Sequence, residues 1–190
     1  MMKLRHIPLL FLMGFILFPC LGVAEIKFSD RIEEYSLDNE MKVILIQDKR
    51  SPIVVSSLWY KVGSSFEYPG VTGISHILEH MMFKGTTTTE AGEFSRIIKQ
   101  LGGSENAFTG RDFTGYYQKV HKDYLETCLK YESDRMVNLM LNQEDLRTER
   151  EVVKEERRLR TEDNPSSKAY EKIGMQIFGL QKYGIPIIGT

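Results

Sequence analysis

The chain has 190 residues, 25 of them basic and 26 acidic, with a formal net charge of −1, and 42% of the residues are hydrophobic. This composition is typical of a globular protein and gives no indication of nucleic-acid binding. The chain has two cysteines, Cys20 and Cys128. Because Cys20 lies in the leader described next, an internal disulfide is excluded in the mature chain.

The first 24 residues have the features of a secretory signal peptide. Two basic residues, Lys3 and Arg5, precede an apolar run over residues 7–23 that ends in small residues. A retained membrane anchor is the alternative interpretation, but Pro19 and the short length of the run argue against a stable span. We therefore expect export to the periplasm or secretion, removal of residues 1–24, and one mature domain over residues 25–190.

The elements that follow begin with strands and end with helices. Strands are predicted over residues 34–36, 41–47, 53–62, 106–110 and 114–120. Helices are predicted around residues 74–83 and over 91–101, 123–141, 142–163 and 166–178, and the chain closes on a strand-like stretch at 186–188. Locally paired strands with helices gathered elsewhere predict an α+β fold, with a mainly antiparallel sheet and helices packed on it.

The helix at residues 74–83 carries the segment His76-Ile-Leu-Glu79-His80. Histidines four residues apart leave a helix on the same face and can bind one metal ion. Glu79 lies beside them, where it could take a proton from water in a zinc-dependent hydrolysis. An opposite, core-facing stripe is expected from the helical periodicity, and it comprises Ile74, Ile77, Leu78 and Met81. The alternative is two surface histidines beside an incidental glutamate.

A catalytic zinc site needs a third protein ligand and one open position. His6 lies in the leader, and His121 lies at a predicted strand end, where a surface role is the simpler interpretation. The two cysteines are far apart in sequence and form no ligand pair. The third ligand is therefore expected to be a carboxylate.

The charged segment 142–163 contains that carboxylate. Its sparse apolar residues form one helical stripe, which comprises Leu146, Val152, Val153 and Leu159. Glu149 and Glu156 fall on this stripe, whereas Glu155 points away from it. Burial of a carboxylate on an apolar face is costly unless a cation meets it. This nominates Glu156 as the ligand and Glu149 as an outer-shell group. The alternative is a metal-free stripe neutralised by Arg160.

Several segments resemble the pitrilysin/insulinase family of zinc peptidases, the inverzincins, and in particular its shorter bacterial and processing-peptidase-like members. The segments are GISHILEHMMFKGT, GGSENAFTGRDFTGYY, the helix with ERE-VV-KEE, and the final YGIPIIGT. The resemblance implies one zinc ion per chain, bound by His76, His80 and Glu156. It implies that Glu79 is the general base and that Glu149 supports catalysis from outside the metal shell.

The same resemblance implies where the substrate binds. In the family, an Asn-Ala strand at the sheet edge beside the zinc pairs with the peptide substrate, and here these residues are Asn106 and Ala107. An exposed strand edge binds extended peptides through backbone hydrogen bonds. The alternative is an ordinary interior strand of a hairpin.

Members of the family have a second half that closes over the substrate, and no such half follows Thr190 in this chain. We therefore expect a C-terminally incomplete catalytic domain, whose partners are a peptide or small-protein substrate, the missing half and a possible companion subunit. The expected function is a zinc metalloendopeptidase acting on extended or unstructured peptides, without nucleic acid and without a membrane span in the mature chain. The alternatives are a catalytically silent companion subunit of the same fold and a non-enzymatic zinc-binding module.

Overall fold

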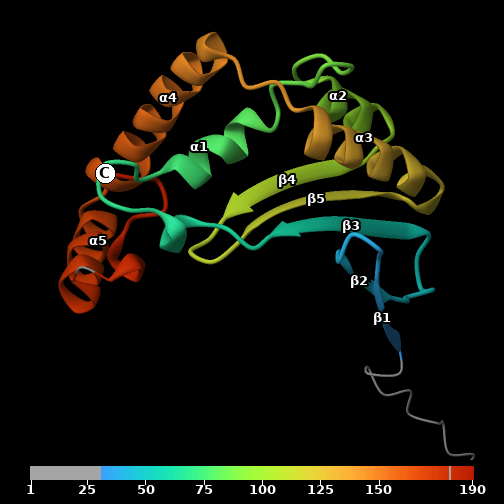
Figure 1. The fold of residues 1–190 in the computed structure, drawn as a ribbon, viewed down its shortest axis with the longest axis horizontal. Helices are drawn as coiled ribbons and strands as arrows, with labels where there is room; N and C mark the ends of the chain where they lie inside the picture. The colour runs from blue at the N-terminus through green and yellow to red at the C-terminus, as the bar shows by residue number, and fades with distance from the viewer. Residues whose placement is uncertain (1–30, 180) are drawn as a thin grey trace, which may run out of the picture. The chain divides into compact units, whose positions relative to one another are not determined.

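The computed structural model describes residues 31–179 and 181–190, so the predicted signal peptide lies outside the described residues. The chain divides after Arg50 into two compact units, which are described separately (Figure 1). Across the described ranges, no helix is both long enough and apolar enough to cross a membrane.

The first unit contains a β-hairpin. Its strands are β1 (Ile32–Ser36) and β2 (Lys42–Ile46), which pair antiparallel. A tight turn joins them, closed by a hydrogen bond of 2.9 Å from the Glu40 amide to the Leu37 carbonyl. Both strands coincide with predicted ones, with ends that differ by one or two residues.

The second unit is built on a three-stranded antiparallel sheet. Its strands are β3 (Ile53–Tyr60), β4 (Ser104–Thr109) and β5 (Thr114–His121), in the order β3-β5-β4. Within the part of the chain that the structure describes, β4 is therefore an edge strand of this sheet. The helices within residues 74–138 lie over one face of this sheet in Figure 1, which agrees with the predicted α+β fold with an antiparallel sheet.

The core lies between the sheet and the helices α2 (Glu93–Gln100) and α3 (Leu125–Asn138). Side chains alternate between the two faces of a strand, so every second residue of β5 points toward these helices. The core cluster combines that face with apolar residues of both helices, and it comprises Phe94, Ile98, Val120 and Cys128. Cys128 is fully buried.

A buried ion pair adjoins this core. Arg135 of α3 bonds to Glu132, and both side chains are less than one tenth exposed. Gln118 of β5 donates to Glu132 Oε1 at 2.6 Å. The Arg135 guanidinium also lies 4.5 Å from the ring centroid of Tyr116, a distance suited to a cation–π interaction. Gln118 Nε2 and the Arg135 guanidinium thus satisfy the Glu132 carboxylate, whereas Gln118 Oε1 has no hydrogen-bond partner among the described residues.

The remaining helices position the candidate site. Helix α1 (Ile74–Met81) contacts α4 (Gln143–Arg157), and α4 continues as a π-helical segment, Arg158–Glu162, before α5 (Pro165–Phe178). Helices α4 and α5 begin at asparagines whose side chains accept hydrogen bonds from the first turn, Asn142 from the Asp145 amide and Asn164 from the Ser167 amide. Both helix starts lie within one residue of the predicted ones, and such N-caps stabilise them.

Three expectations about local structure are wrong. The stretch 186–188 forms no strand. Pro186 has no amide to donate to a ladder, and the Gly189 amide instead closes a turn on the Pro186 carbonyl at 2.9 Å. On the expected core-facing stripe of α1, Met81 is buried, but Ile74 and Leu78 are exposed, and His76 on the opposite face is buried. The polar face of α1 is turned inward because α4 supplies charged partners for it, so its burial carries little penalty.

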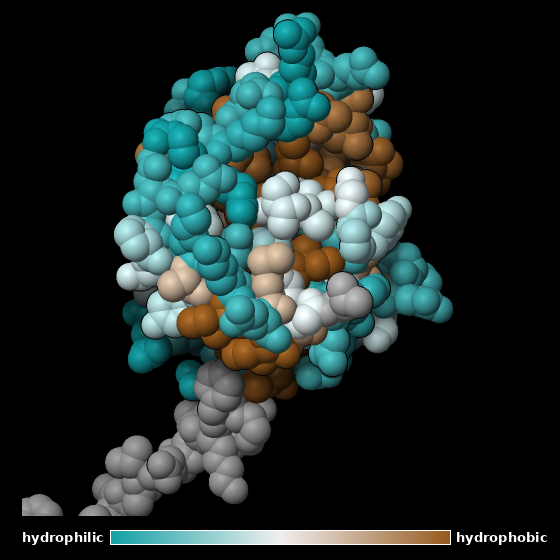
Figure 2. Space-filling view, turned by 90° about the vertical axis from the view of Figure 1, so that its left-hand side faces the viewer, coloured by the Kyte–Doolittle hydropathy of each residue, from teal (hydrophilic) through white to brown (hydrophobic). Residues whose placement is uncertain are grey.

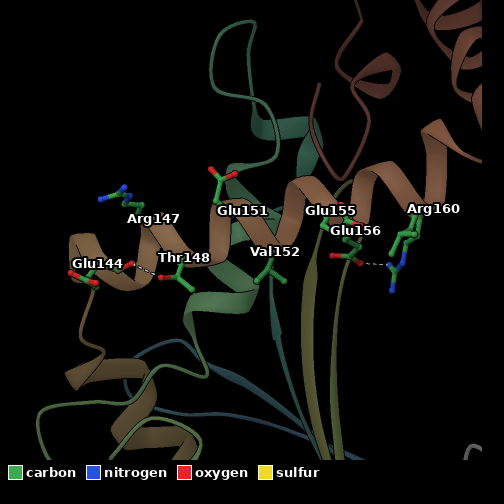
Figure 3. A pocket seen from close by; sticks show the side chains of 9 residues that line it. Glu144, Arg147, Thr148, Glu151, Val152, Glu155, Glu156 and Arg160 are labelled. Atoms are coloured by element: carbon green, nitrogen blue, oxygen red, sulfur yellow. Dashed lines mark hydrogen bonds and ion pairs between the residues drawn. The ribbon is translucent and has the colours of Figure 1, made fainter.

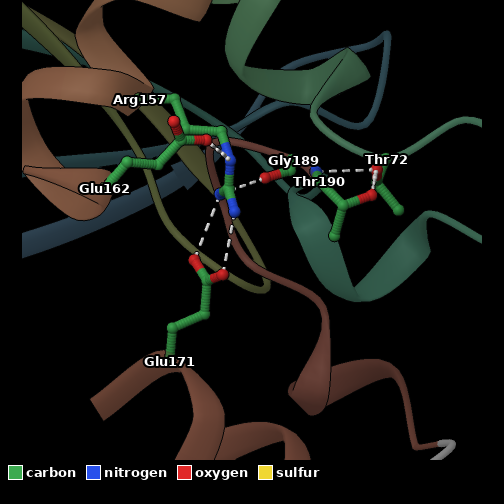
Figure 4. Close-up of polar contacts among 6 residues, drawn as sticks. All are labelled: Thr72, Arg157, Glu162, Glu171, Gly189 and Thr190. Carbon is green, nitrogen blue, oxygen red and sulfur yellow. Dashed lines mark hydrogen bonds and ion pairs between the residues drawn. The ribbon is translucent and has the colours of Figure 1, made fainter. Parts of the chain in front are cut away.

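The predicted apolar stripe of α4 is also mostly exposed. Val153 is buried, but Leu146, Val152 and Leu159 are exposed. Val152 and Leu159 line an open groove of about 780 Å³ formed by α4 and the π-helical segment alone (Figure 3). Figure 2 shows that hydrophobic patches interrupt the hydrophilic surface on the side of the molecule at the left of Figure 1. The buried residues of α4 are Glu149 and Val153, both of which lie on the predicted stripe.

Candidate metal centre

The start of α1 is held by a buried carboxylate. Glu67 accepts hydrogen bonds from the Gly73 amide at 2.7 Å and the Ser75 amide at 2.8 Å. A carboxylate here satisfies amides that have no partner within the helix and interacts favourably with the helix dipole. Gly73 has φ 79°, and a Cβ at this position would lie 2.8 Å from the Ile188 carbonyl oxygen, so both the backbone angle and the close approach require glycine.

Three predicted ligands converge between α1 and α4. Glu156 Oε2 lies 3.5 Å from His80 Nε2 and 3.7 Å from His76 Nε2. The ligand atoms offered by these three residues all lie within 4.8 Å of one another. Ligands about 2.0–2.1 Å from a tetrahedral zinc ion lie about 3.3 Å apart. The two distances to Glu156 are thus close to the spacing that a zinc ion requires.

The protonation of His76 suits a metal ligand. Burial lowers the pKa of the His76 imidazole below its ordinary value, and the nearby Glu156 carboxylate only partly opposes this effect. Metal ligands must be deprotonated at the donor atom, so a neutral imidazole is the form that binds. The residues present therefore fit zinc in donor type, number, spacing and charge.

Glu149 lies directly behind His80. Its Oε2 is 3.0 Å from His80 Nδ1, and its Oε1 is 2.5 Å from Lys84 Nζ. Burial raises the pKa of Glu149, but the hydrogen bonds from Lys84 and His80 outweigh this and hold its pKa below the usual value. A carboxylate on Nδ1 directs the lone pair of Nε2 toward the metal position, which is the outer-shell arrangement expected for Glu149.

Arg160 pairs with the other oxygen of Glu156, at 2.6 Å from Oε1 (Figure 3). This is the neutralising contact that the metal-free alternative requires, but it engages only Oε1 and leaves Oε2 facing both histidines. Glu155 is exposed and pairs with Arg158 at 2.6 Å. The structure therefore brings Glu156, and not its neighbour, to the histidines.

Glu79 lies one turn from His76 and faces β4. Its Oε2 accepts a hydrogen bond of 2.5 Å from the Thr109 hydroxyl. His76, Glu79 and His80 line a cavity of about 900 Å³ that is also bordered by Asn106 and Ala107. The candidate base, the candidate ligands and the candidate substrate strand thus share one cavity.

The geometry of β4 shows which backbone groups face its free edge. A hydrogen bond of 2.7 Å from the Gly110 amide to the Phe113 carbonyl closes the β4–β5 hairpin, and Ala107 lies opposite Tyr116. Bonded and non-bonded pairs alternate along an antiparallel ladder, which places the amide and carbonyl of Ala107 on the side away from β5. The Asn106 side chain covers that amide, accepting from it at 2.9 Å. Ala107 thus presents edge groups, and Asn106 shields one of them.

Sequence reasoning did not identify Glu67, Lys84 or Thr109. A signal existed for Lys84, because a carboxylate placed on a buried helix face calls for a cation, and Lys84 follows the motif helix closely. Nothing local marked Glu67 or Thr109, since their partners lie 6 to 30 residues away and meet them only in the fold.

The site as a whole has the donor set of a catalytic zinc centre. Its three donors leave room for a fourth, exchangeable position, which distinguishes a catalytic zinc site from a closed structural one. The Glu79 carboxylate and the free edge of β4 border the same cavity.

Comparison with known proteins identifies the family. The family model described as Insulinase (Peptidase family M16) matches residues 42–190, so the chain belongs to this family. It is 33% identical to the uncharacterized zinc protease YmxG of Bacillus subtilis over 84% of this chain and 39% of that protein. It is 37% identical to the zinc protease PqqE of Helicobacter pylori over 73% of this chain and 31% of that protein.

A solved structure shares the fold. The crystal structure of a protease from Helicobacter pylori superposes with a TM-score of 0.81 at 34% identity, covering 84% of this chain and 38% of that one. The chain thus spans about two fifths or less of the length of these relatives. The names of the relatives and the donor set together identify zinc as the cofactor.

Proposed function

We propose that the complete protein containing this chain is an exported zinc endopeptidase that hydrolyses extended or unstructured peptides. The observation that carries the proposal is the convergence of His76, His80 and Glu156 in a cavity bordered by Glu79 and the free edge of β4. A zinc ion held by these three residues supplies Lewis acidity, which makes water nucleophilic near neutral pH.

The residues of the chain divide the remaining work. The edge amide and carbonyl of Ala107 pair with the backbone of an extended peptide once the Asn106 side chain moves aside, which gives affinity with little sequence preference. Glu79 removes a proton from the attacking water and later delivers it to the leaving amine, the role of a general base and acid. Glu149 keeps His80 in the tautomer that binds metal.

Export is proposed from the composition of residues 1–24, with its basic start and short apolar run. The measurement is N-terminal sequencing of the protein recovered from the periplasmic and extracellular fractions of a bacterial host. A mature N-terminus near Glu25 supports export with cleavage, whereas an intact leader in the membrane fraction supports the retained anchor.

A silent companion subunit is the second candidate. Such a subunit would have lost a metal ligand or the general base. Here His76, Glu79, His80 and Glu156 are all present. A non-enzymatic zinc module would need a closed coordination shell, whereas these donors number three and face a cavity. Both observations favour the peptidase.

The test uses the complete gene product, because the chain spans only part of the length of its relatives. The wild type should bind one zinc per chain and cleave a disordered peptide, and a zinc chelator should abolish the cleavage. His76→Ala and Glu156→Gln should lose stoichiometric zinc, while Glu155→Gln, the adjacent control, should keep it. Glu79→Gln should keep its zinc and lose at least about a hundredfold in rate. Zinc retained by the ligand variants, or activity retained by Glu79→Gln, would overturn the proposal.

A further inference from the structure

We propose that Thr109 is a positioning residue for Glu79, and that its hydroxyl holds the carboxylate of the general base in the orientation needed for turnover. The inference rests on the proposed function. It starts from the hydrogen bond of 2.5 Å that joins Thr109 Oγ1 to Glu79 Oε2 across 30 residues of sequence. An ionised carboxylate can only accept a hydrogen bond, so the Thr109 hydroxyl is the donor to Glu79 in the form that a base requires.

The strand side of this contact is held firmly. Thr109 is the last residue of β4 and lies opposite Thr114, whose hydroxyl donates to the Val62 carbonyl at 2.9 Å. The turn that follows is bonded to the segment after β3, through the Ser64 amide and the Gly110 carbonyl at 3.2 Å. The packing is so close that a Cβ at Gly63 would lie 2.4 Å from the Gly110 carbonyl oxygen. Thr109 therefore has little freedom to move away from its partner.

The helix side is held by the same segment. Three residues after Ser64, Glu67 accepts the hydrogen bonds from Gly73 and Ser75 that fix the start of α1. One stretch of chain, residues 62–67, thus braces the β4–β5 turn at one end and the motif helix at the other. The distance from Thr109 to Glu79 is set by backbone contacts on both sides, and not by chance contact of two flexible side chains.

Orientation matters at Glu79 because the terminal torsion of a glutamate is broad and has no strong intrinsic preference. Thr109 is β-branched and has restricted rotamers, so its hydroxyl is a well-defined donor. With Oε2 held by Thr109, Oε1 remains as the proton acceptor. Within residues 31–179 and 181–190, the Glu79 side chain forms no second hydrogen bond. Holding a reacting group in place lowers the barrier of the step in which it acts, so the effect should fall on kcat.

The experiment compares Thr109→Val with Thr109→Ser in the complete zinc-loaded protein. Valine keeps the shape of threonine without the hydroxyl, whereas serine keeps the hydroxyl. Thr109→Val should lower kcat about ten- to a hundredfold with KM and zinc content unchanged, because a hydrogen bond to a charged group is lost. Thr109→Ser should recover kcat to within about threefold of the wild type. Thr148→Val is the matched control, since its exposed hydroxyl bonds to the Glu144 carbonyl within α4, and its kcat should match the wild type.

The outcomes separate this inference from the proposed function on which it rests. If Glu79→Gln is inactive while Thr109→Val keeps the kcat of the wild type, the positioning role is overturned and the peptidase assignment stands. Equal losses in Thr109→Val and Thr109→Ser also overturn it, since the hydroxyl is then not the cause. If Glu79→Gln is as active as the wild type, the proposed function itself fails. Should the valine variant not fold, Thr109→Ala is compared with Thr109→Ser by the same measurements.

Discussion

Replacement of Glu149 tests whether an outer carboxylate sets the zinc affinity of this site. Its Oε2 lies 3.0 Å from His80 Nδ1, and its side chain is buried. A hydrogen bond to a charged group contributes about 1.5–3 kcal/mol, and each 1.4 kcal/mol is about a tenfold change in affinity. Glu149→Ala should therefore weaken zinc binding by about ten- to a hundredfold, the range found for outer-shell partners of metal-bound histidines.

Glu149→Gln should have a smaller effect, about tenfold, because its amide oxygen can still accept from His80 Nδ1 while the charge is lost. Lys84, which pairs with Glu149 at 2.5 Å, is partly exposed and can turn toward water in either variant, so the fold should survive. Zinc affinity is measured by competition with a chromogenic chelator, alongside a thermal unfolding curve for each variant. Glu151→Gln, on the exposed side of the same helix, is the control. Zinc affinity of Glu149→Ala within about twofold of the wild type would refute the reasoning.

Three further predictions concern stability and completeness. Hydrogen bonds from Thr86, and then from Asn138 and neighbouring threonines, hold the pKa of Asp134 at about 2, below its ordinary 3.8. The free energy of unfolding that Asp134→Asn loses should therefore be constant above pH 3.8 and should vanish as the pH falls toward 2. Urea unfolding of both proteins at each pH measures this difference. Arg135→Met should cost about 3–5 kcal/mol of unfolding free energy by leaving Glu132 buried without a counter-ion, and a loss below about 1 kcal/mol in chemical denaturation would contradict this. Residues 25–190 alone should cleave a disordered peptide at least about a hundredfold more slowly than the complete protein. The reason is that the rest of the complete protein is expected to close the chamber and to supply the donors that stabilise the oxyanion. Chelator-sensitive cleavage by residues 25–190 at the full rate would contradict this prediction.

Much of the fold was predictable from local signals. The described strands all begin and end within two residues of predicted ones, as do the helical segments 143–162 and 165–178. The stretch 186–188 was misassigned because β-branched residues outweighed the proline, which cannot join a ladder through an amide. Whether a short segment of this kind forms a strand depends on whether a partner strand lies beside it.

The orientation of α1 was the main failure of sequence reasoning. Periodicity placed Ile74 and Leu78 toward the core, yet both are exposed and His76 is buried. Periodicity can divide a helix into faces, but the face that becomes buried depends on what the neighbouring element offers. Here each helix offers the other charged partners, which removes most of the usual cost of burying polar groups.

The sequence by itself determined the chemistry of the site. The spacing of His76 and His80, the glutamate between them and the choice of Glu156 over Glu155 follow from helix geometry, because residues within one helix have fixed relative positions. Only the tertiary structure decided the rest. Lys84 against Glu149 and Thr109 against Glu79 are contacts between different elements, and their distances depend on how helices and strands pack, which no local periodicity encodes.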